Sequence, residues 1–349
     1  MKKIKVGLIG YGFSGATFHA PLLEVLEEYE IAKVMSSNKE KVQNDLGEVE
    51  VVENLEKVLS DQDIELVVIT TPNTLHYEMA KQSLSAKKHV IVEKPMVIDP
   101  GEAEELIQLA KENDRMLSVY QNRRWDNDFL TIKQLISNDV LGEINTYEAH
   151  FDRFRPEVRN RWREKAGKGS GMLYDLGSHL IDQALHLFGE PKFVLADVFA
   201  QRKNAETDDY FHIIMGYENL RVILHSGSIV KEQGPRYKVH GSKGSFIKYG
   251  IDGQEAALKT GKKPTENDWG KDKPKWYGHL FISENGQDIE KTIETVPGSY
   301  TSYYKQVYDH IRNGKPSPVT AEEGLKTIET IQAAIKSSEE KRAVYFNEN

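Results

Sequence analysis

Residues 4–15 read IKVGLIGYGFSG, an apolar run that passes directly into a G-x-G-x-x-G motif. Alone, such a motif is a weak signal, but here it follows a strand pattern and opens a helical pattern at Ala16. In that context the glycines permit a tight turn and a close approach of the backbone to a pyrophosphate at a helix N-terminus. The stretch therefore predicts a dinucleotide-binding Rossmann domain; the alternative is a plain strand–helix turn. The candidate cofactor-binding residues of this loop are Gly10, Tyr11, Gly12, Phe13, Ser14 and Gly15.

The first part of the chain alternates short apolar runs with helical patterns. The run LVVIT at 66–70 is continuous and β-branched, as expected for a parallel strand covered on both faces. Strands that alternate with helices predict a parallel, doubly wound sheet. The expected strands are 4–9, 31–35, 66–70, 89–92 and 116–120, and the expected helices are 16–28, 77–86 and 102–113.

The pattern changes after residue 122. Several strand-like stretches then follow one another without helices between them, which favours a mostly antiparallel sheet. The chain is therefore expected to be an α/β protein with a Rossmann domain at 1–122 and a second α/β domain at 123–349. In this second part we expect helices at 127–138, 173–188, 300–312 and 321–339, strands at 144–154, 193–202, 210–217, 220–229, 237–241 and 245–249, and a surface loop at 252–275.

Composition excludes several classes of function. The 349 residues suit two domains of about 150 residues each. The net charge of −8 argues against a nucleic-acid binder, which would usually present a basic face. The absence of cysteine rules out disulfides, thiolate nucleophiles and cysteine-based metal sites. No apolar run approaches the roughly 20 residues of a membrane span, and the N-terminus lacks a signal-peptide pattern, so a cytoplasmic location is expected.

The end of the second expected strand bears on which nicotinamide cofactor binds. An NAD-binding domain usually has an acidic residue there, which binds the adenosine ribose hydroxyls. This chain has Ser36, Ser37 and Asn38 instead, with Lys41 just beyond. Hydroxyl, amide and ammonium groups suit a 2′-phosphate, which a carboxylate would repel. The residues favour NADP, with NAD and an ordinary Ser/Asn-rich turn as alternatives.

Two further strand ends carry candidate residues. In a doubly wound sheet, ligands bind at the carboxyl ends of the strands. The strand that ends near residue 70 leads into a polar loop suited to the cofactor ribose, although Asn73 or Thr74 would also serve as a helix cap. The strand at 89–92 leads into Glu93-Lys94-Pro95, where a lysine can stabilise a developing alkoxide, although such a lysine is more often a plain loop residue. The cofactor candidates of these loops are Thr70, Thr71, Pro72, Asn73, His76, Glu93 and Lys94, with Asn122 after the last Rossmann strand.

Asp175 and His179 open the strongest helical pattern of the second half. Their spacing of four places them on one helix face, and a carboxylate can hold an imidazole ready to exchange a proton near neutral pH. Taken alone, the pair is more often a helix-start contact that satisfies itself. The stretch 122–126 either lines the cleft or forms ion pairs between domains. No His/Asp/Glu cluster has metal-ligand spacing, so no metal site is expected.

Four stretches, taken in order, resemble the glucose–fructose oxidoreductase and inositol dehydrogenase (Gfo/Idh/MocA) family over essentially the whole chain. They are GYGFSG at 10–15, TPNTLH at 71–76, EKP at 93–95 and GMLYDLGSHLID at 171–182. The resemblance implies a C-terminal α/β domain with an open, mainly antiparallel sheet that binds the substrate and forms oligomer contacts. It also implies that Lys94 orients substrate and cofactor, that His179 is the acid/base, and that Asp175 binds substrate or positions His179.

Within the family, the chain is most similar to the bacterial NADP-dependent scyllo-inositol dehydrogenases. The stretches YQNRRW at 120–125, YKVHGSKGSFIKY at 237–249 and DGQE at 252–255 carry this similarity. The implied reaction is reversible hydride transfer between a ring carbinol of a polyol or sugar and the nicotinamide, with Lys94 and His179 meeting across the cleft between the domains. The candidate substrate residues are Arg153, Trp162, Arg163 and Tyr174.

Two other functions stay open at this point. One is a dihydrodiol, aldose or ketosugar dehydrogenase of the same family. The other is a non-catalytic NADP-binding regulator, since fold does not fix function. A regulator could discard the lysine and the histidine, so their joint presence favours an enzyme. A homo-oligomer, dimer or tetramer, is also expected, because an open sheet needs a cover over its second face.

Overall fold

The computed structural model describes residues 2–346, which form two compact units. Unit 1 contains the chain up to Trp125 together with Gly253–Trp269 and Ser299–Leu325. Unit 2 contains Asp126–Asp252, Gly270–Gly298 and the segment from Lys326 onward. The boundary expected after residue 122 assumes one continuous segment per domain, whereas each unit is built from three segments. No helix among residues 2–346 is both long and apolar enough to cross a membrane.

Unit 1 contains a six-stranded parallel sheet in the order β3-β2-β1-β4-β5-β6. This confirms the doubly wound parallel sheet, and β4 is buried along nearly its whole length, as its β-branched sequence predicts. The strand β3 was not expected from the sequence. The strands are β1 (Ile4–Ile9), β2 (Tyr29–Met35), β3 (Glu50–Val52), β4 (Ile64–Ile69), β5 (His89–Glu93) and β6 (Leu117–Tyr120).

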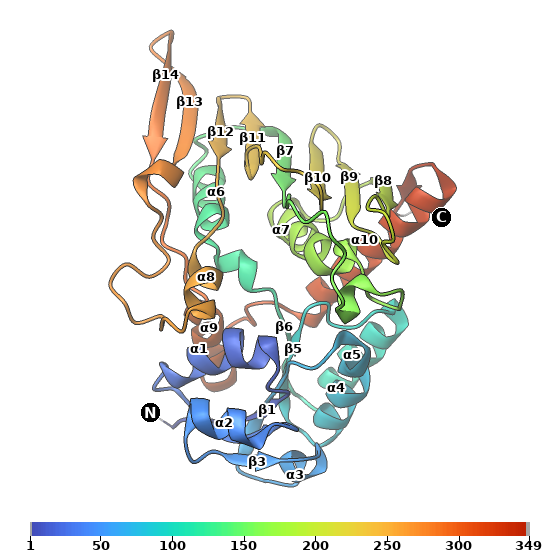
Figure 1. Ribbon diagram of the computed structural model, residues 1–349. Coiled ribbons are helices and arrows are strands. Elements are labelled where there is room, and N and C mark those ends of the chain that lie inside the picture. Colours follow the sequence, from blue (N-terminus) through green and yellow to red (C-terminus); the bar gives the residue numbers. More distant parts are fainter. Residues whose placement is uncertain (1, 347–349) are drawn as a thin grey trace. The chain divides into compact units, whose positions relative to one another are not determined.

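Helices cover both faces of this sheet, with α4 and α5 on one side and α1 and α9 on the other (Figure 1). The helix α9 belongs to the late segment of the chain that returns to unit 1. It packs there through fully buried tyrosines: the Tyr29 hydroxyl donates to the Tyr304 carbonyl at 2.6 Å, and the Tyr303 hydroxyl lies 2.8 Å from Ser118 Oγ. The helices are α1 (Ala20–Glu24), α2 (Lys39–Leu46), α3 (Glu56–Leu59), α4 (His76–Ser85), α5 (Pro100–Glu112), α8 (Gln254–Lys259) and α9 (Thr301–Asn313), with a π-helical turn at Gly15–His19 and 3₁₀ turns at Asn73–Leu75 and Asn122–Trp125.

Unit 2 contains a nine-stranded sheet in the order β14-β13-β12-β11-β7-β10-β9-β8-β15. Its paired strands are antiparallel except for β7 and β10, which confirms the mainly antiparallel sheet. The strands are β7 (Ile144–His150), β8 (Phe193–Phe199), β9 (Tyr210–Gly216), β10 (Arg221–Gly227), β11 (Tyr237–Gly241), β12 (Gly244–Lys248), β13 (Gly278–Glu284), β14 (Gln287–Ile293) and β15 (Val344–Tyr345).

The two faces of the unit 2 sheet differ in burial. The inner face carries buried apolar side chains such as Tyr147, Ala149 and Leu224, and α7 with its preceding π-helical turn packs against β9 and β10. On the outward face the alternate residues are half-buried or exposed, including Leu195, Phe199 and Phe281. The helices of this unit are α6 (Asn127–Ser137), α7 (Ser178–Phe188) after the π turn Leu173–Gly177, and most of α10 (Ala321–Glu340), with 3₁₀ turns at Trp162–Glu164 and Pro274–Trp276.

Two sequence expectations for the late part of the chain are corrected. The segment 252–275 is not all loop, because Gln254–Lys259 forms α8 and packs in unit 1. The hairpin β13–β14 was not expected at all. Its turn is Asn285-Gly286, and both residues have positive φ (53° and 78°), as a two-residue hairpin turn requires.

Candidate active site

The glycine loop after β1 is tightly packed at Gly10 and Gly15, and the space beside Gly12 is free. Gly10 has a φ of +92°, and a Cβ on Gly15 would lie 2.4 Å from the Gly10 carbonyl oxygen. The Thr70 hydroxyl donates to that same oxygen at 2.8 Å, which fixes the turn against the end of β4. By contrast, a Cβ on Gly12 would meet nothing within 4 Å. The loop therefore has the close packing and the free space at Gly12 that fit the pyrophosphate of a dinucleotide.

The residues after β2 form a cluster of hydrogen-bond donors beside this loop. Asn38 caps α2 by accepting the Lys41 backbone N–H at 3.0 Å, and its own N–H donates to Ser36 Oγ at 3.1 Å. The Lys41 ammonium lies 3.4 Å from the Tyr11 carbonyl oxygen and 5.4 Å from the Tyr11 ring centroid. Ser37 is exposed. Hydroxyl and ammonium groups thus lie where an NAD-binding domain usually places a carboxylate.

His76 connects the loops that follow β4 and β5. Its side chain is buried, with Nδ1 2.9 Å from the Pro95 carbonyl oxygen and Nε2 3.0 Å from the Thr71 carbonyl oxygen. Burial lowers the pKa of His76, so the imidazole is neutral near pH 7 and its single N–H donates to one of the two carbonyls. The structure thus gives His76 a positioning role for the loop that carries Lys94.

The carboxylate of Glu93 joins the lysine loop to the glycine loop. Its Oε1 accepts hydrogen bonds from Ser14 Oγ and from His19 Nε2, the latter at 3.0 Å, and its Oε2 accepts the Lys94 backbone N–H at 3.1 Å. Burial alone would raise the pKa of this carboxyl, but the contacts with His19 and Ser14 and the charge of Lys94 lower it to about 2. Glu93 is therefore ionised at neutral pH and acts only as an acceptor.

His19 is a site residue that the sequence patterns do not single out. It is fully buried, and its Nδ1 lies 2.6 Å from the hydroxyl of Tyr304 on α9. Nε2 donates to the Glu93 carboxylate, so the ring bridges this carboxylate and the Tyr304 hydroxyl. The available signal was a histidine in the first helical turn after a glycine motif, but its partners Glu93 and Tyr304 are far away in sequence.

The stretch after β6 forms ion pairs, and these lie within unit 1. Arg123 pairs with Glu255, and Arg124 pairs with Glu323 at 2.8 Å. Both arginines are buried, and Asn122 is buried beside them in the 3₁₀ turn. Burial alone would raise the pKa of Glu255, but Arg123 and Lys259 lower it to about 2. These pairs hold the returning segments against the Rossmann sheet.

In unit 2, Asp175 lies in the π-helical turn that precedes α7, and His179 lies buried in the first turn of α7. Asp175 is flanked by two guanidinium groups, Arg153 Nη1 at 3.9 Å and Arg163 Nε at 3.7 Å. The turn begins after Gly171, where a Cβ would lie 1.9 Å from Asp208 Oδ1. The other carboxylate oxygen of Asp208 accepts the Leu173 N–H at 2.7 Å and so anchors the start of the turn.

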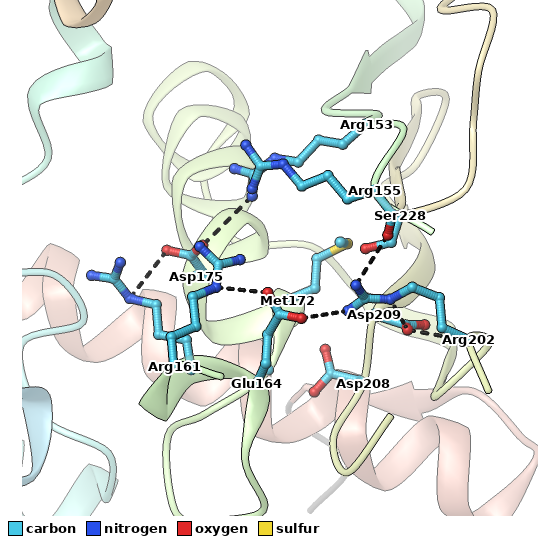
Figure 2. Close-up of a pocket in the computed structure, with 12 residues that line it drawn as sticks. Arg153, Arg155, Arg161, Glu164, Met172, Asp175, Arg202, Asp208, Asp209 and Ser228 are labelled. Atoms are coloured by element: carbon cyan, nitrogen blue, oxygen red, sulfur yellow. Dashed lines mark hydrogen bonds and ion pairs between the residues drawn. The ribbon is translucent and has the colours of Figure 1, made fainter. Parts of the chain in front are cut away.

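Figure 2 shows a pocket of unit 2 in which several arginines surround Asp175. Glu164 pairs with Arg161 at 2.6 Å and with Arg202 at 3.0 Å. Burial lowers the pKa of the Arg155 guanidinium and raises that of the Asp208 carboxyl to about 6. The pocket is lined by Arg153, Arg155, Arg161, Arg163, Glu164, Gly171, Met172, Asp175, Arg202, Asp208, Asp209 and Ser228.

The structure brings together only some of the expected substrate residues. Arg153 and Arg163 lie in this pocket with Asp175. Trp162 is 44% exposed, and the Arg163 guanidinium lies 5.1 Å from its ring centroid. Tyr174 is buried, and its hydroxyl accepts a hydrogen bond from Gln332 on α10 at 2.9 Å. Of these four residues, Tyr174 thus packs within unit 2.

Two family models match the chain and together cover most of it. Residues 4–121 match the oxidoreductase family's NAD-binding Rossmann fold, and residues 133–346 match its C-terminal alpha/beta domain. The chain therefore belongs to the GFO/IDH/MocA oxidoreductase family. It is an oxidoreductase whose first unit is the family's NAD-binding domain.

Similar proteins and solved structures match this chain over nearly its whole length. The chain is 54% identical to the scyllo-inositol 2-dehydrogenase (NADP(+)) IolW of Bacillus subtilis, over 98% of this chain and 95% of that protein. It is 25% identical to a myo-inositol 2-dehydrogenase of Thermotoga maritima, over 99% of each chain. The crystal structure of the oxidoreductase YvaA of Bacillus subtilis superposes with a TM-score of 0.97 at 54% identity, covering 99% of each chain.

The Glu93 contacts predict a pH-dependent contribution to stability. The pKa is lowered from 4.5 to about 2, so the stabilisation is fully present above pH 4.5 and is lost as the pH falls towards 2. Glu93→Gln should lower the free energy of unfolding by about 1.5–3 kcal/mol near neutral pH, because an amide cannot accept from all three donors. Urea titrations across this pH range should show the difference from wild type shrinking at acid pH.

Glu105→Gln is the matched control for this prediction. Glu105 is exposed on α5 and pairs with Lys81 at the surface, so its loss should leave stability almost unchanged. Equal stability of the Glu93→Gln variant and wild type near neutral pH would contradict the role given to the buried carboxylate.

Proposed function

We propose that the protein is an NADP-dependent dehydrogenase that oxidises a ring hydroxyl of a cyclic polyol or sugar, with scyllo-inositol as the first candidate. The similarity to the scyllo-inositol 2-dehydrogenase of Bacillus subtilis over nearly the whole chain is the observation that carries the substrate class. The pocket around Asp175 supports it, because guanidinium and carboxylate groups together can hydrogen-bond several hydroxyls of one ring.

The proposed roles of the reactive residues follow from the chemistry of alcohol oxidation. The bound nicotinamide supplies the hydride acceptor at C4. His179 takes the proton of the substrate hydroxyl, Lys94 stabilises the charge that develops on that oxygen, and Asp175 binds the substrate or orients His179. Arg153, Arg163 and Trp162 are proposed substrate contacts. The backbone of the loop that carries Lys94 is held by the contacts of Glu93 with the Lys94 N–H and of His76 with the Pro95 carbonyl.

The proposal can be tested with a panel of inositols and sugars at equal concentrations of NADP⁺ and NAD⁺. We expect the highest kcat/KM for a cyclic polyol, with scyllo-inositol ahead of aldoses such as glucose. If the best substrate is a dihydrodiol, an aldose or a ketosugar, the protein is a dehydrogenase of the same family with a different substrate class. Tight NADPH binding without turnover of any polyol, sugar or ketone would favour a regulator.

We expect the enzyme to prefer NADP over NAD. Ser36, Ser37, Asn38 and Lys41 offer donors to a 2′-phosphate, and residues 36–38 after β2 include no carboxylate to bind an unmodified ribose. Ser37→Asp should shift the ratio of kcat/KM for NADP to that for NAD by at least about tenfold towards NAD. Ser37→Ala, the control, should weaken NADP use without improving NAD use. Higher efficiency with NAD in wild type would overturn the preference.

The proposed roles of His179 and Lys94 can be tested by replacing each residue. Removing a positioned acid/base or a group that stabilises developing charge costs about 10²–10⁴-fold in rate. His179→Ala and Lys94→Ala should therefore each lose at least roughly a hundredfold in kcat/KM, while NADPH binding, followed by fluorescence, persists in His179→Ala. His186→Ala, on the same helix, should keep activity. Near-normal turnover by His179→Ala would show that another group exchanges the proton.

We further propose that the protein is a homo-oligomer, a dimer or tetramer that covers the outward face of the unit 2 sheet. Apolar side chains on that face, including Leu195, Phe199 and Phe281, are exposed by more than a third of their surface. Light scattering at micromolar concentration should give a multiple of the 39.8 kDa chain mass. A monomer mass would refute this proposal.

A further inference from the structure

A cluster of two histidines and one aspartate lies on the outward face of the unit 2 sheet. His150 ends β7, and the parallel pairing of β7 with β10 places His225 directly opposite it. Asp152 follows two residues later, so it shares the outward face with His150, while the Arg153 side chain points to the opposite face. The cluster therefore lies on the other side of the sheet from the arginine-lined pocket around Asp175.

The separations within this cluster match a set of metal ligands. Asp152 Oδ2 lies 3.5 Å from His150 Nδ1, and Asp152 Oδ1 lies 3.3 Å from His225 Nε2. Tetrahedral ligands about 2.1 Å from a cation lie about 3.4 Å from one another. The three ligand atoms, one from each residue, all lie within 4.8 Å of one another. The two separations involve different oxygens of Asp152, and each is longer than a good hydrogen bond and near the spacing of two ligand atoms around one cation.

Neighbouring groups also suit a bound cation. Asp152 Oδ1 accepts the Gly227 N–H at 2.9 Å, which orients the carboxylate. A ligating histidine usually donates its second N–H to a carboxylate. His150 Nε2 is buried and lies 3.5 Å from a carboxylate oxygen of Glu148, which also pairs with Lys238.

We propose that His150, Asp152 and His225 form a binding site for one divalent transition-metal cation per chain, with Zn²⁺ as the probe. Two imidazoles and one carboxylate, with no sulfur ligand, suit zinc and its neighbours rather than calcium or magnesium. Three protein ligands leave one coordination position for water or a further donor. The sequence does not reveal this site, because β-sheet register, and not local spacing, brings His225 to the other two residues.

The test uses the full-length protein after removal of metal with a chelator. Zn²⁺ should bind with one equivalent per chain in calorimetric titrations, and Co²⁺ should give the visible absorption of a low-symmetry nitrogen–oxygen site. His225→Gln should weaken Zn²⁺ binding by at least about a hundredfold, and Glu148→Gln by about 10–100-fold through loss of the second contact of His150. Saturating Zn²⁺ should raise the Tm of wild type and leave that of His225→Gln unchanged.

His279→Gln is the matched control. His279 lies on β13, on the same outward face, and pairs with Glu290 at 2.9 Å outside the cluster, so its replacement should not change Zn²⁺ affinity. Asp152→Asn replaces His225→Gln if the latter does not fold. The proposal is overturned if wild type shows no saturable binding at one equivalent, or if His225→Gln and His279→Gln bind Zn²⁺ equally.

Discussion

The carboxylate of Glu93 is largely buried at the end of β5, and it accepts hydrogen bonds from Ser14, His19 and the Lys94 backbone. A buried charge is costly unless donors surround it, and here the donors come from the glycine loop, the turn after it and the lysine loop. One anion thereby fixes the backbone at Lys94 relative to the loop that fits the pyrophosphate. The Tyr304 hydroxyl on α9 lies 2.6 Å from His19 Nδ1, which links this late helix to the same group of residues in unit 1.

Much of unit 1 is predictable from sequence because its signals are local. The glycine motif follows its strand directly, and β-branched runs such as 66–70 mark parallel strands that are covered on both faces. The loops that follow the strands then locate the candidate cofactor residues, because all parallel strands end at one edge of the sheet. The sequence therefore predicts both a cofactor loop and a Lys94 loop, and the structure places them after β1 and β5.

Features that depend on distant partners could not be read in the same way. The role of His19 depends on Glu93 and Tyr304, which are distant in sequence. The sequence of segments 253–269 and 299–325 likewise does not indicate that they pack in unit 1. The grouping of His150 with His225 arises from strand register alone. The β13–β14 hairpin is different, because its Asn285-Gly286 turn is a local signal that could have been recognised.

The proposed reaction is oxidation of a polyol by transfer of a hydride from a ring carbon to the nicotinamide. The most direct measurement uses scyllo-inositol deuterated at every ring carbon, with NADP⁺, and mass spectrometry of the reduced cofactor. We expect NADPH that carries one deuterium, formed by wild type and not by His179→Ala on the same timescale. Reduced cofactor without deuterium, or no reduction by wild type, would contradict it.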